Sequence, residues 1–350
     1  MSAEFTIIFM NLLIITQKVD RNDPILGFFH RWLEEFAKNA EKLTVICLEK
    51  GEYNLPENVN ILSLGKENGK SRIKYLRRFY KYIWRERNNY NAVFAHMNPE
   101  YIILGGLVWK IMGKKIAFWY VHKAVNLKLK IAEKLADKIF TASRESFRLP
   151  SKKVQITGHG IDIDKFSIFN FQFSKKIRIV TAGRIAPVKN LDILIEAAEI
   201  LKNKGVDFQI KIAGSPIIEA DKIYFEKLKS EIRQKNLENF VFFAGPIPYS
   251  QIQDFYRSGD IFVNLSETGS VDKAVLEAMA CGLSIATSNQ AFKNILPHKY
   301  FLEEKNPEAL AQKLSELSAE KRPDFKLREI ALKEHSLQSL IPKIIKELES

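Results

Sequence analysis

Short apolar runs alternate with amphipathic helical patterns along the whole chain, and this alternation constrains the fold more than any other feature. Runs typical of buried strands lie at residues 6–15, 43–48, 92–95, 115–120, 138–141, 177–181, 208–213, 240–243, 261–264 and 284–287. Helical patterns lie at residues 28–39, 191–202, 222–234, 249–257, 272–280, 307–317 and 337–348. Strands that alternate with helices predict βαβ units, and therefore parallel sheets.

The chain is too long for one hydrophobic core. It has 350 residues, whereas single cores seldom grow past roughly 250 residues. We therefore expect an α/β protein with two Rossmann-like domains, whose parallel sheets face each other across a cleft. The polar stretch that ends near Lys176 predicts domains at 1–168 and 169–335. The last segment, 336–350, is expected to form a helix that packs back toward the first domain.

Positive charge is concentrated in the first half of the chain. Residues 1–168 contain 28 Lys and Arg against 17 Asp and Glu, whereas residues 169–350 contain 26 against 24. The surplus is therefore +11 in the first half and +2 in the second. Such an asymmetry indicates an anionic partner for the first half, with phospholipid, a lipid pyrophosphate or nucleic acid as candidates.

The most basic stretch is 66–87, with nine Lys or Arg and two Glu. Its aromatic residues are Tyr75, Phe79, Tyr80, Tyr82 and Trp84. Cations interleaved with aromatics suit an anionic membrane surface. RNA binding also fits, because aromatics stack on bases, but no nucleic-acid-binding module accompanies the stretch. An ordinary amphipathic helix with inward aromatics is the third interpretation. We predict a membrane surface and no nucleic-acid partner.

The two cysteines, Cys47 and Cys281, both lie in apolar stretches and have no metal-ligand spacing. A reducing cytoplasm, at most with peripheral attachment to the inner face of the plasma membrane, is the expected location. The apolar run 5–15 lacks a basic leader, and it is shorter than the roughly 20 residues that span a bilayer. We interpret it as a buried strand.

Candidate binding residues follow the first strand of the second half. Gly183 and Arg184 come directly after it, and Lys189 lies at the opening of the next helix. Ligands of parallel sheets bind beyond the carboxyl ends of the strands. A glycine permits a sharp turn there, and two cations can hold a diphosphate and stabilise its departure. Two solvated surface charges are the alternative interpretation.

A second loop, which contains Ser270 and Val271, leads into the helix at 272–280. Small residues let backbone amides face a ligand at a helix N-terminus, and Glu277, about two turns in, can accept both hydroxyls of a ribose. In the alternative interpretation Asp272 is only a helix cap and Glu277 an exposed carboxylate.

These residues carry a resemblance to a known family. The strings 183–189, 213–214, 243–245 and 274–282 resemble, in order and spacing, the donor-binding half of glycosyltransferase family 4. The resemblance covers most of residues 155–290 and implies retaining enzymes of the GT-B fold. The first half is similar only loosely, at Gly27, His122 and the linker 159–162.

The resemblance implies a role for each matching residue. Arg184 and Lys189 would bind the donor diphosphate and assist its departure, the amides of Ser270 and Val271 would add to this, and Glu277 would bind the ribose. The loop glycines implied at the donor are Gly27, Gly183 and Gly214. His122 would position the sugar near the reacting carbon, and His96 and Asn98 would line the acceptor side.

The chain departs from the family at one position. The family has a glutamate eight residues before Glu277 that contacts the transferred sugar, and this chain has Gly269. Glu267 and Asp272 lie close enough in sequence to substitute. We favour Asp272, because it opens the helix that faces the cleft.

The expected activity is transfer of a hexosyl group, with retention, from a nucleoside-diphosphate sugar to a glycan or lipid-linked acceptor held by the N-terminal domain. No Asp-X-Asp pair lies on a candidate donor loop, so we expect neither a metal nor another cofactor. A nucleotide-sugar epimerase of the same architecture is one alternative. A non-catalytic nucleotide-sugar-binding protein is the other, and Gly269 is the reason to retain it.

Overall fold

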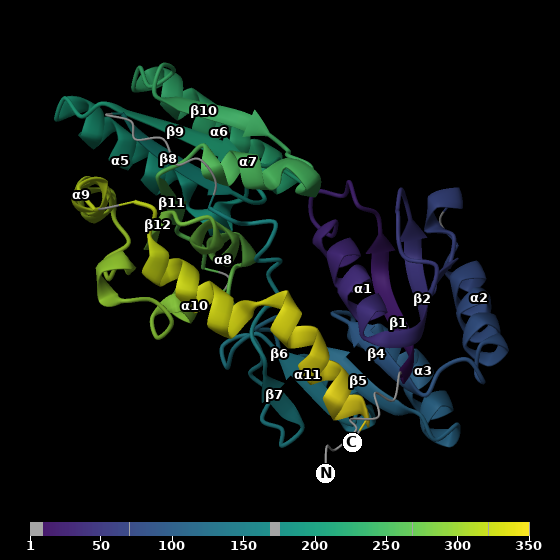
Figure 1. The fold of residues 1–350 in the computed structure, drawn as a ribbon. Coiled ribbons are helices and arrows are strands. Elements are labelled where there is room, and N and C mark those ends of the chain that lie inside the picture. The colour runs from purple at the N-terminus through teal and green to yellow at the C-terminus, as the bar shows by residue number, and fades with distance from the viewer. Residues whose placement is uncertain (1–9, 70, 169–175, 268, 321, 350) are drawn as a thin grey trace, which may run out of the picture. The chain divides into compact units, whose positions relative to one another are not determined.

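The computed structural model describes residues 10–69, 71–168, 176–267, 269–320 and 322–349. They divide into two compact units, which Figure 1 shows with their elements labelled. Unit 1 contains the chain up to Gly160 together with the segment from Leu337 onward, and unit 2 is Ile161–Ser336.

The division between the units comes earlier than the predicted boundary at residue 168, because the intervening segment bonds to unit 2. The amide of Ile161 donates to the His335 carbonyl, and the Arg257 guanidinium donates to the Ser167 carbonyl at 3.1 Å. Arg328 donates to the Phe166 carbonyl at 2.8 Å. Residues 161–168 are therefore a structural part of unit 2.

Unit 1 is built on a seven-stranded parallel sheet with the order β3-β2-β1-β4-β5-β6-β7. Its strands are β1 (Met10–Val19), β2 (Ala40–Lys50), β3 (Val59–Ser63), β4 (Ala92–His96), β5 (Lys115–Trp119), β6 (Lys138–Thr141) and β7 (Val154–Ile156). Its helices are α1 (Phe28–Lys38), α2 (Arg72–Arg85), α3 (Pro99–Ile111), α4 (Leu127–Leu135) and α11 (Leu337–Glu349).

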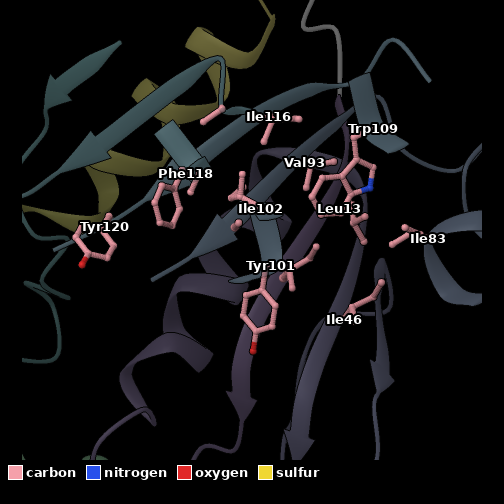
Figure 2. Close-up of a cluster of buried hydrophobic side chains, with 14 of the residues drawn as sticks. Leu13, Ile46, Ile83, Val93, Tyr101, Ile102, Trp109, Ile116, Phe118 and Tyr120 are labelled. Carbon is pink, nitrogen blue, oxygen red and sulfur yellow. The ribbon is translucent and has the colours of Figure 1, made fainter. Parts of the chain in front are cut away.

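One face of this sheet packs against α2, α3 and α4, and Figure 2 shows the resulting core. Side chains alternate along a strand, so Leu13 and Ile15 of β1 point into this cluster while their neighbours point to the other face. The helices contribute Phe79 and Trp109, whose ring centroids lie 6.1 Å apart. Burial of these rings fixes α2 and α3 on the sheet.

The opposite face of the unit 1 sheet is covered by α1 and α11. Trp32 of α1 packs on Trp119 of β5 with a centroid distance of 4.9 Å, and its indole N–H donates to the Gly160 carbonyl at 3.0 Å. From α11, Leu340 and Ile344 are fully buried. The last segment of the chain is thus part of the unit 1 core.

Unit 2 contains a five-stranded parallel sheet with the order β10-β9-β8-β11-β12. Its strands are β8 (Ile177–Ala182), β9 (Phe208–Ala213), β10 (Val241–Gly245), β11 (Ile261–Asn264) and β12 (Ser284–Thr287). Its helices are α5 (Leu191–Asn203), α6 (Glu219–Gln234), α7 (Ile252–Arg257), α8 (Lys273–Ala280), α9 (Pro307–Ser318) and α10 (Phe325–His335).

The predicted elements of the second half are confirmed, as is the terminal helix, while β3, β7, α3, α4 and α10 were not anticipated. Residues 6–9 of the first predicted strand lie outside the described residues. In the described part of the chain, no helix combines the length and the apolar character needed to cross a membrane.

We predict that Gly160→Ala destabilises unit 1 by about 2–4 kcal/mol, because overpacking adds to the cost of a left-handed backbone. At this glycine φ is +73°, and an added Cβ would lie 2.5 Å from the Trp32 ring and 2.7 Å from Leu340. All four tryptophans belong to unit 1, so urea unfolding followed by tryptophan fluorescence reports on this unit.

Gly113→Ala is the matched control, because its φ is +66° and nothing lies within 4 Å of an added Cβ. This variant should lower the free energy of unfolding only by the cost of the left-handed backbone, roughly 1–2 kcal/mol. Equal losses in the two variants would contradict the packing argument.

Candidate functional site

The strand order of unit 2 creates a crevice at the carboxyl edge of its sheet. The chain proceeds from β8 to β9 and β10 on one side and to β11 and β12 on the other, so the loops after β8 and β11 diverge. Such a switch point is where open α/β sheets bind ligands. A pocket lies at this position, lined by Thr181, Ala182, Gly183, Arg184, Lys189, Leu191, Ile212, Ala213, Asn264 and Leu265.

Gly183, which lines the pocket, and Gly214, which follows the lining residue Ala213, bring neighbouring loops into direct backbone contact. The amide of Gly183 donates to the Ala213 carbonyl at 3.0 Å, and the amide of Gly214 donates to the Gly245 carbonyl at 2.8 Å. Gly214 has a φ of +132°, and a Cβ there would lie 1.8 Å from the Gly183 carbonyl oxygen. Only glycine fits at this position, because the clash would be with backbone.

Lys189 lines the pocket and forms an ion pair with Asp272 that the sequence did not predict. Its ammonium lies 2.6 Å from a carboxylate oxygen of Asp272, whose side chain is 16% exposed. The same carboxylate accepts from the Asn264 side chain at 3.0 Å and from the Ala274 amide at 3.4 Å. Asp272 therefore caps α8 and fixes the Lys189 ammonium at once.

The electrostatics of Asp272 follow from these partners. Burial alone would favour the neutral acid, but the charge and hydrogen bond of Lys189, aided by Asn264, hold the pKa of Asp272 below its ordinary value. Asp272, which we favoured as the contact to the sugar, thus has its carboxylate engaged within unit 2. The other sequence candidate, Glu267, forms an ion pair with Lys305.

Arg184 is held less tightly than Lys189. Its side chain is 43% exposed, and its Nε lies 3.7 Å from the buried Asp221 carboxylate. That distance is too long for a direct hydrogen bond. Because Arg184 and Lys189 both line the pocket, the structure brings the two predicted diphosphate ligands together.

Gly269 differs from the family glutamate in backbone as well as side chain. Its φ is +65°, a left-handed conformation that a glutamate rarely adopts. Its neighbour Thr268 lies outside the described residues. In the following turn the Ser270 carbonyl accepts from the Asn289 side chain at 3.0 Å, and Val271 is buried.

Glu277 lies on α8 and is buried by groups that the sequence did not reveal. The Tyr256 hydroxyl donates to one carboxylate oxygen at 2.8 Å, and the Lys273 ammonium lies 3.1 Å from the other. Glu277 is 4% exposed, so it is not the exposed carboxylate of the alternative interpretation. The spacing of four between Lys273 and Glu277 was a usable signal, whereas Tyr256 comes from α7 and left none.

Beside Glu277, two ammonium groups approach the Tyr249 ring. Lys165 lies 3.9 Å from the ring centroid and Lys273 lies 4.6 Å from it. Burial lowers the pKa of Lys165 to about 8. Of these two ammonium groups, that of Lys273 also pairs with the Glu277 carboxylate.

In unit 1, His122 follows β5 in an exposed loop. Its Nδ1 accepts from the Ala124 amide at 3.0 Å, so in the neutral ring Nε2 carries the proton and can donate. Gly27 directly precedes α1, and its amide donates to the Asp23 carbonyl at 3.0 Å. The φ of Gly27 is −57°, which other residues adopt equally well.

His96 and Asn98 end β4 and begin α3, at the switch point of the unit 1 sheet. His96 is only 2% exposed, and its ring stacks on Phe29 with centroids 4.0 Å apart. This aromatic packing removes the ring from the surface that the acceptor-side prediction requires. Asn98 is partly exposed at the first turn of α3.

No group of three or more His, Cys, Asp or Glu side chains that could hold a metal ion occurs among the residues that the structure describes.

Comparisons with known proteins agree with this geometry. Residues 162–334 match the family model described as glycosyl transferases group 1. An amylovoran biosynthesis glycosyltransferase of Erwinia amylovora is 30% identical over 180 residues, in a match that covers 48% of this chain and 43% of the relative. Mannosylfructose-phosphate synthase of Agrobacterium fabrum is 26% identical over 150 residues, in a match that covers 39% of this chain and 33% of the relative. The chain thus spans less than half the length of these curated relatives.

Solved structures extend the likeness to both units. Anabaena HepE, solved in complex with UDP and glucose, has a TM-score of 0.77 and 16% identity, over 97% of this chain and 100% of that one. A lipopolysaccharide outer core galactosyltransferase has a TM-score of 0.67 and 12% identity, over 97% and 99%. At these identities the likeness establishes the fold alone, and the predicted GT-B class is confirmed.

We predict that Asp272→Asn destabilises unit 2 by about 1–3 kcal/mol at neutral pH, because it leaves the partly buried Lys189 ammonium without its charged partner. A lowered folded-state pKa means that the carboxylate stabilises the fold above its unfolded-state pKa. That contribution is lost as the pH falls through the lower, folded-state value. The difference in free energy of unfolding between wild type and variant should therefore become smaller in acid. Urea unfolding followed by circular dichroism measures it.

Asp254→Asn is the control, since this carboxylate is 71% exposed and forms a surface ion pair with Arg257. If wild type and Asp272→Asn differ in free energy of unfolding by the same amount at neutral and at acid pH, Asp272 does not act as an ionised partner.

Proposed function

Because residues 162–334 form a domain of the glycosyl transferases group 1 family, we propose that this chain is a retaining glycosyltransferase. It transfers a hexosyl group from a nucleoside-diphosphate sugar to a glycan or lipid-linked acceptor. The observation that carries the proposal is the meeting of Arg184 and Lys189 in one pocket at the switch point of the unit 2 sheet. This is the place and the charge that a diphosphate requires.

Transfer breaks the bond between the sugar carbon C1 and the diphosphate oxygen, and negative charge grows on the departing diphosphate. Arg184 and Lys189 stabilise that charge, and Lys189 does so from a position already fixed by Asp272. The acceptor oxygen bonds to C1 on the face that the phosphate leaves, and its proton passes to the departing phosphate. The proposal needs no catalytic carboxylate pair and no metal cofactor.

The remaining site residues are proposed in supporting roles. The absent Cβ atoms of Gly183 and Gly214 let the loop approach the phosphates closely. His122 donates from Nε2 to the sugar. Glu277 accepts from the ribose hydroxyls in exchange for the Lys273 ammonium, which now occupies one of its oxygens.

A uridine diphosphate sugar is the first donor to test, since Anabaena HepE was solved with UDP and glucose. The relatives named above are transferases and synthases, so the epimerase alternative is not favoured. A non-catalytic binding protein remains the second candidate, because Gly269 and its left-handed backbone replace the glutamate that contacts the sugar in the family.

We expect Arg184→Ala and Lys189→Ala each to lower turnover at least about a hundredfold, because each removes a charge that stabilises the leaving group. Release of the nucleoside diphosphate, measured with and without acceptor, is the assay. Lys222→Ala is the control, since this lysine of α6 is 60% exposed and forms an ion pair with exposed Glu219. Turnover of both pocket variants within about threefold of wild type would refute the assignment.

Donor binding can be tested without turnover. A donor present at about 100 times its Kd should stabilise the protein by about 2.7 kcal/mol, which raises the unfolding temperature. We expect such a shift with at least one member of a panel of UDP-, GDP- and ADP-sugars, and a smaller shift in Arg184→Ala. A shift without any turnover or hydrolysis would favour the non-catalytic candidate, and no shift with any donor would count against both.

A further inference from the structure

The outward face of α2 is apolar even though the helix is already anchored by its inward face. Phe79 and Ile83 are 1% exposed and hold the helix on the unit 1 sheet. On the other side, Ile73 is 68% exposed and Trp84 is 60% exposed, with Leu76 and Tyr80 between them. Positions 73, 76, 80 and 84 share one face of a helix, so they form a continuous apolar stripe in solvent.

A second exposed stripe lies on the neighbouring helix α3. Leu104, Leu107 and Ile111 follow the same helical spacing, and Ile111 is 88% exposed. The Tyr80 hydroxyl donates to the Leu104 carbonyl at 3.0 Å, so the two stripes adjoin. We name this surface, formed by the stripes of α2 and α3, the α2–α3 face. Exposed apolar surface that extends over two helices marks an interaction site.

The charged residues that α2 contributes around the α2–α3 face are all positive. Six of the fourteen residues of Arg72–Arg85 are basic and none is acidic. Arg72, Lys74, Arg77 and Lys81 are exposed beside the apolar stripe. A surface that combines an apolar ridge with flanking cations matches the interface of an anionic bilayer, where apolar side chains enter the acyl boundary and cations meet the headgroups.

We propose that the α2–α3 face docks on a bilayer containing anionic phospholipid. A second copy of this chain fits less well, because two such faces would bring their cations together. RNA also fits less well, because five of the seven side chains that define the face are aliphatic, and only Tyr80 and Trp84 offer a ring on which a base can stack. The proposal concerns unit 1 alone and does not depend on glycosyl transfer.

The test is co-sedimentation of the full chain with phosphatidylcholine vesicles, with and without phosphatidylglycerol. We expect binding only to the anionic vesicles, weakened as salt is raised. Ile73→Ser and Leu107→Ser should each weaken binding about tenfold or more. Replacing Arg72, Lys74, Arg77 and Lys81 together by Gln should weaken it at least about a hundredfold, since each charge contributes roughly fivefold.

Ile223→Ser is the matched control, because Ile223 lies on α6 of unit 2 and is 68% exposed, as Ile73 is. It should bind vesicles like wild type, and all variants should keep the wild-type unfolding temperature, because the replaced side chains are exposed. Equal binding to neutral vesicles, no binding to either kind, or an equal loss in the control would overturn the proposal. Tighter binding to single-stranded RNA than to anionic vesicles would also overturn it, in favour of a nucleic-acid surface.

Discussion

The parallel direction of every paired strand is the constraint on which the rest of the structure depends. A parallel neighbour can be reached only by a crossover, so the chain passes through a helix or a long connection after almost every strand. All loops that follow the strands then emerge at one edge of each sheet. In unit 2 this brings Gly183 after β8 and Asn264 at the end of β11 to one pocket, although they are far apart in sequence.

At that edge, backbone contact and charge pairing together organise the pocket in advance of any ligand. Gly183 and Gly214 approach so closely that a Cβ on Gly214 would clash with a carbonyl. The Asp272 carboxylate joins the Lys189 loop to the N-terminus of α8. Desolvation opposes this ion pair, but its hydrogen bonds to Asn264 and Ala274 offset the cost. The Lys189 ammonium is therefore oriented by protein rather than by a ligand.

Unit 1 uses helices for two purposes at once. The inner side of α2 supplies Phe79 to the core, and its outer side presents Ile73 and Trp84 to solvent. Folding accounts for the inner side, because burial of aromatic surface is its main driving force. The outer side contributes nothing to that core, and for this reason we propose that it binds a partner, an anionic bilayer.

The sequence by itself determined the two parallel α/β sheets, because buried strands of such sheets appear as continuous apolar runs. The GT-B class came from the resemblance of the strings 183–189, 213–214, 243–245 and 274–282 to a known family. The sequence missed β3 and β7, the edge strands of unit 1, whose residues are partly exposed and carry a weaker apolar signal. It also identified Arg184, Lys189 and Glu277 as charged residues on loops and helices of the second half.

Only the tertiary structure decided what those charges meet. Asp272 lies 83 residues beyond Lys189, and Tyr256 lies on a different helix from Glu277, so no local pattern pairs them. The structure likewise buried His96 against Phe29 and joined the stripes of α2 and α3 through Tyr80. Contacts of this kind depend on how distant elements pack, and a one-dimensional pattern records only which residues are available to make them.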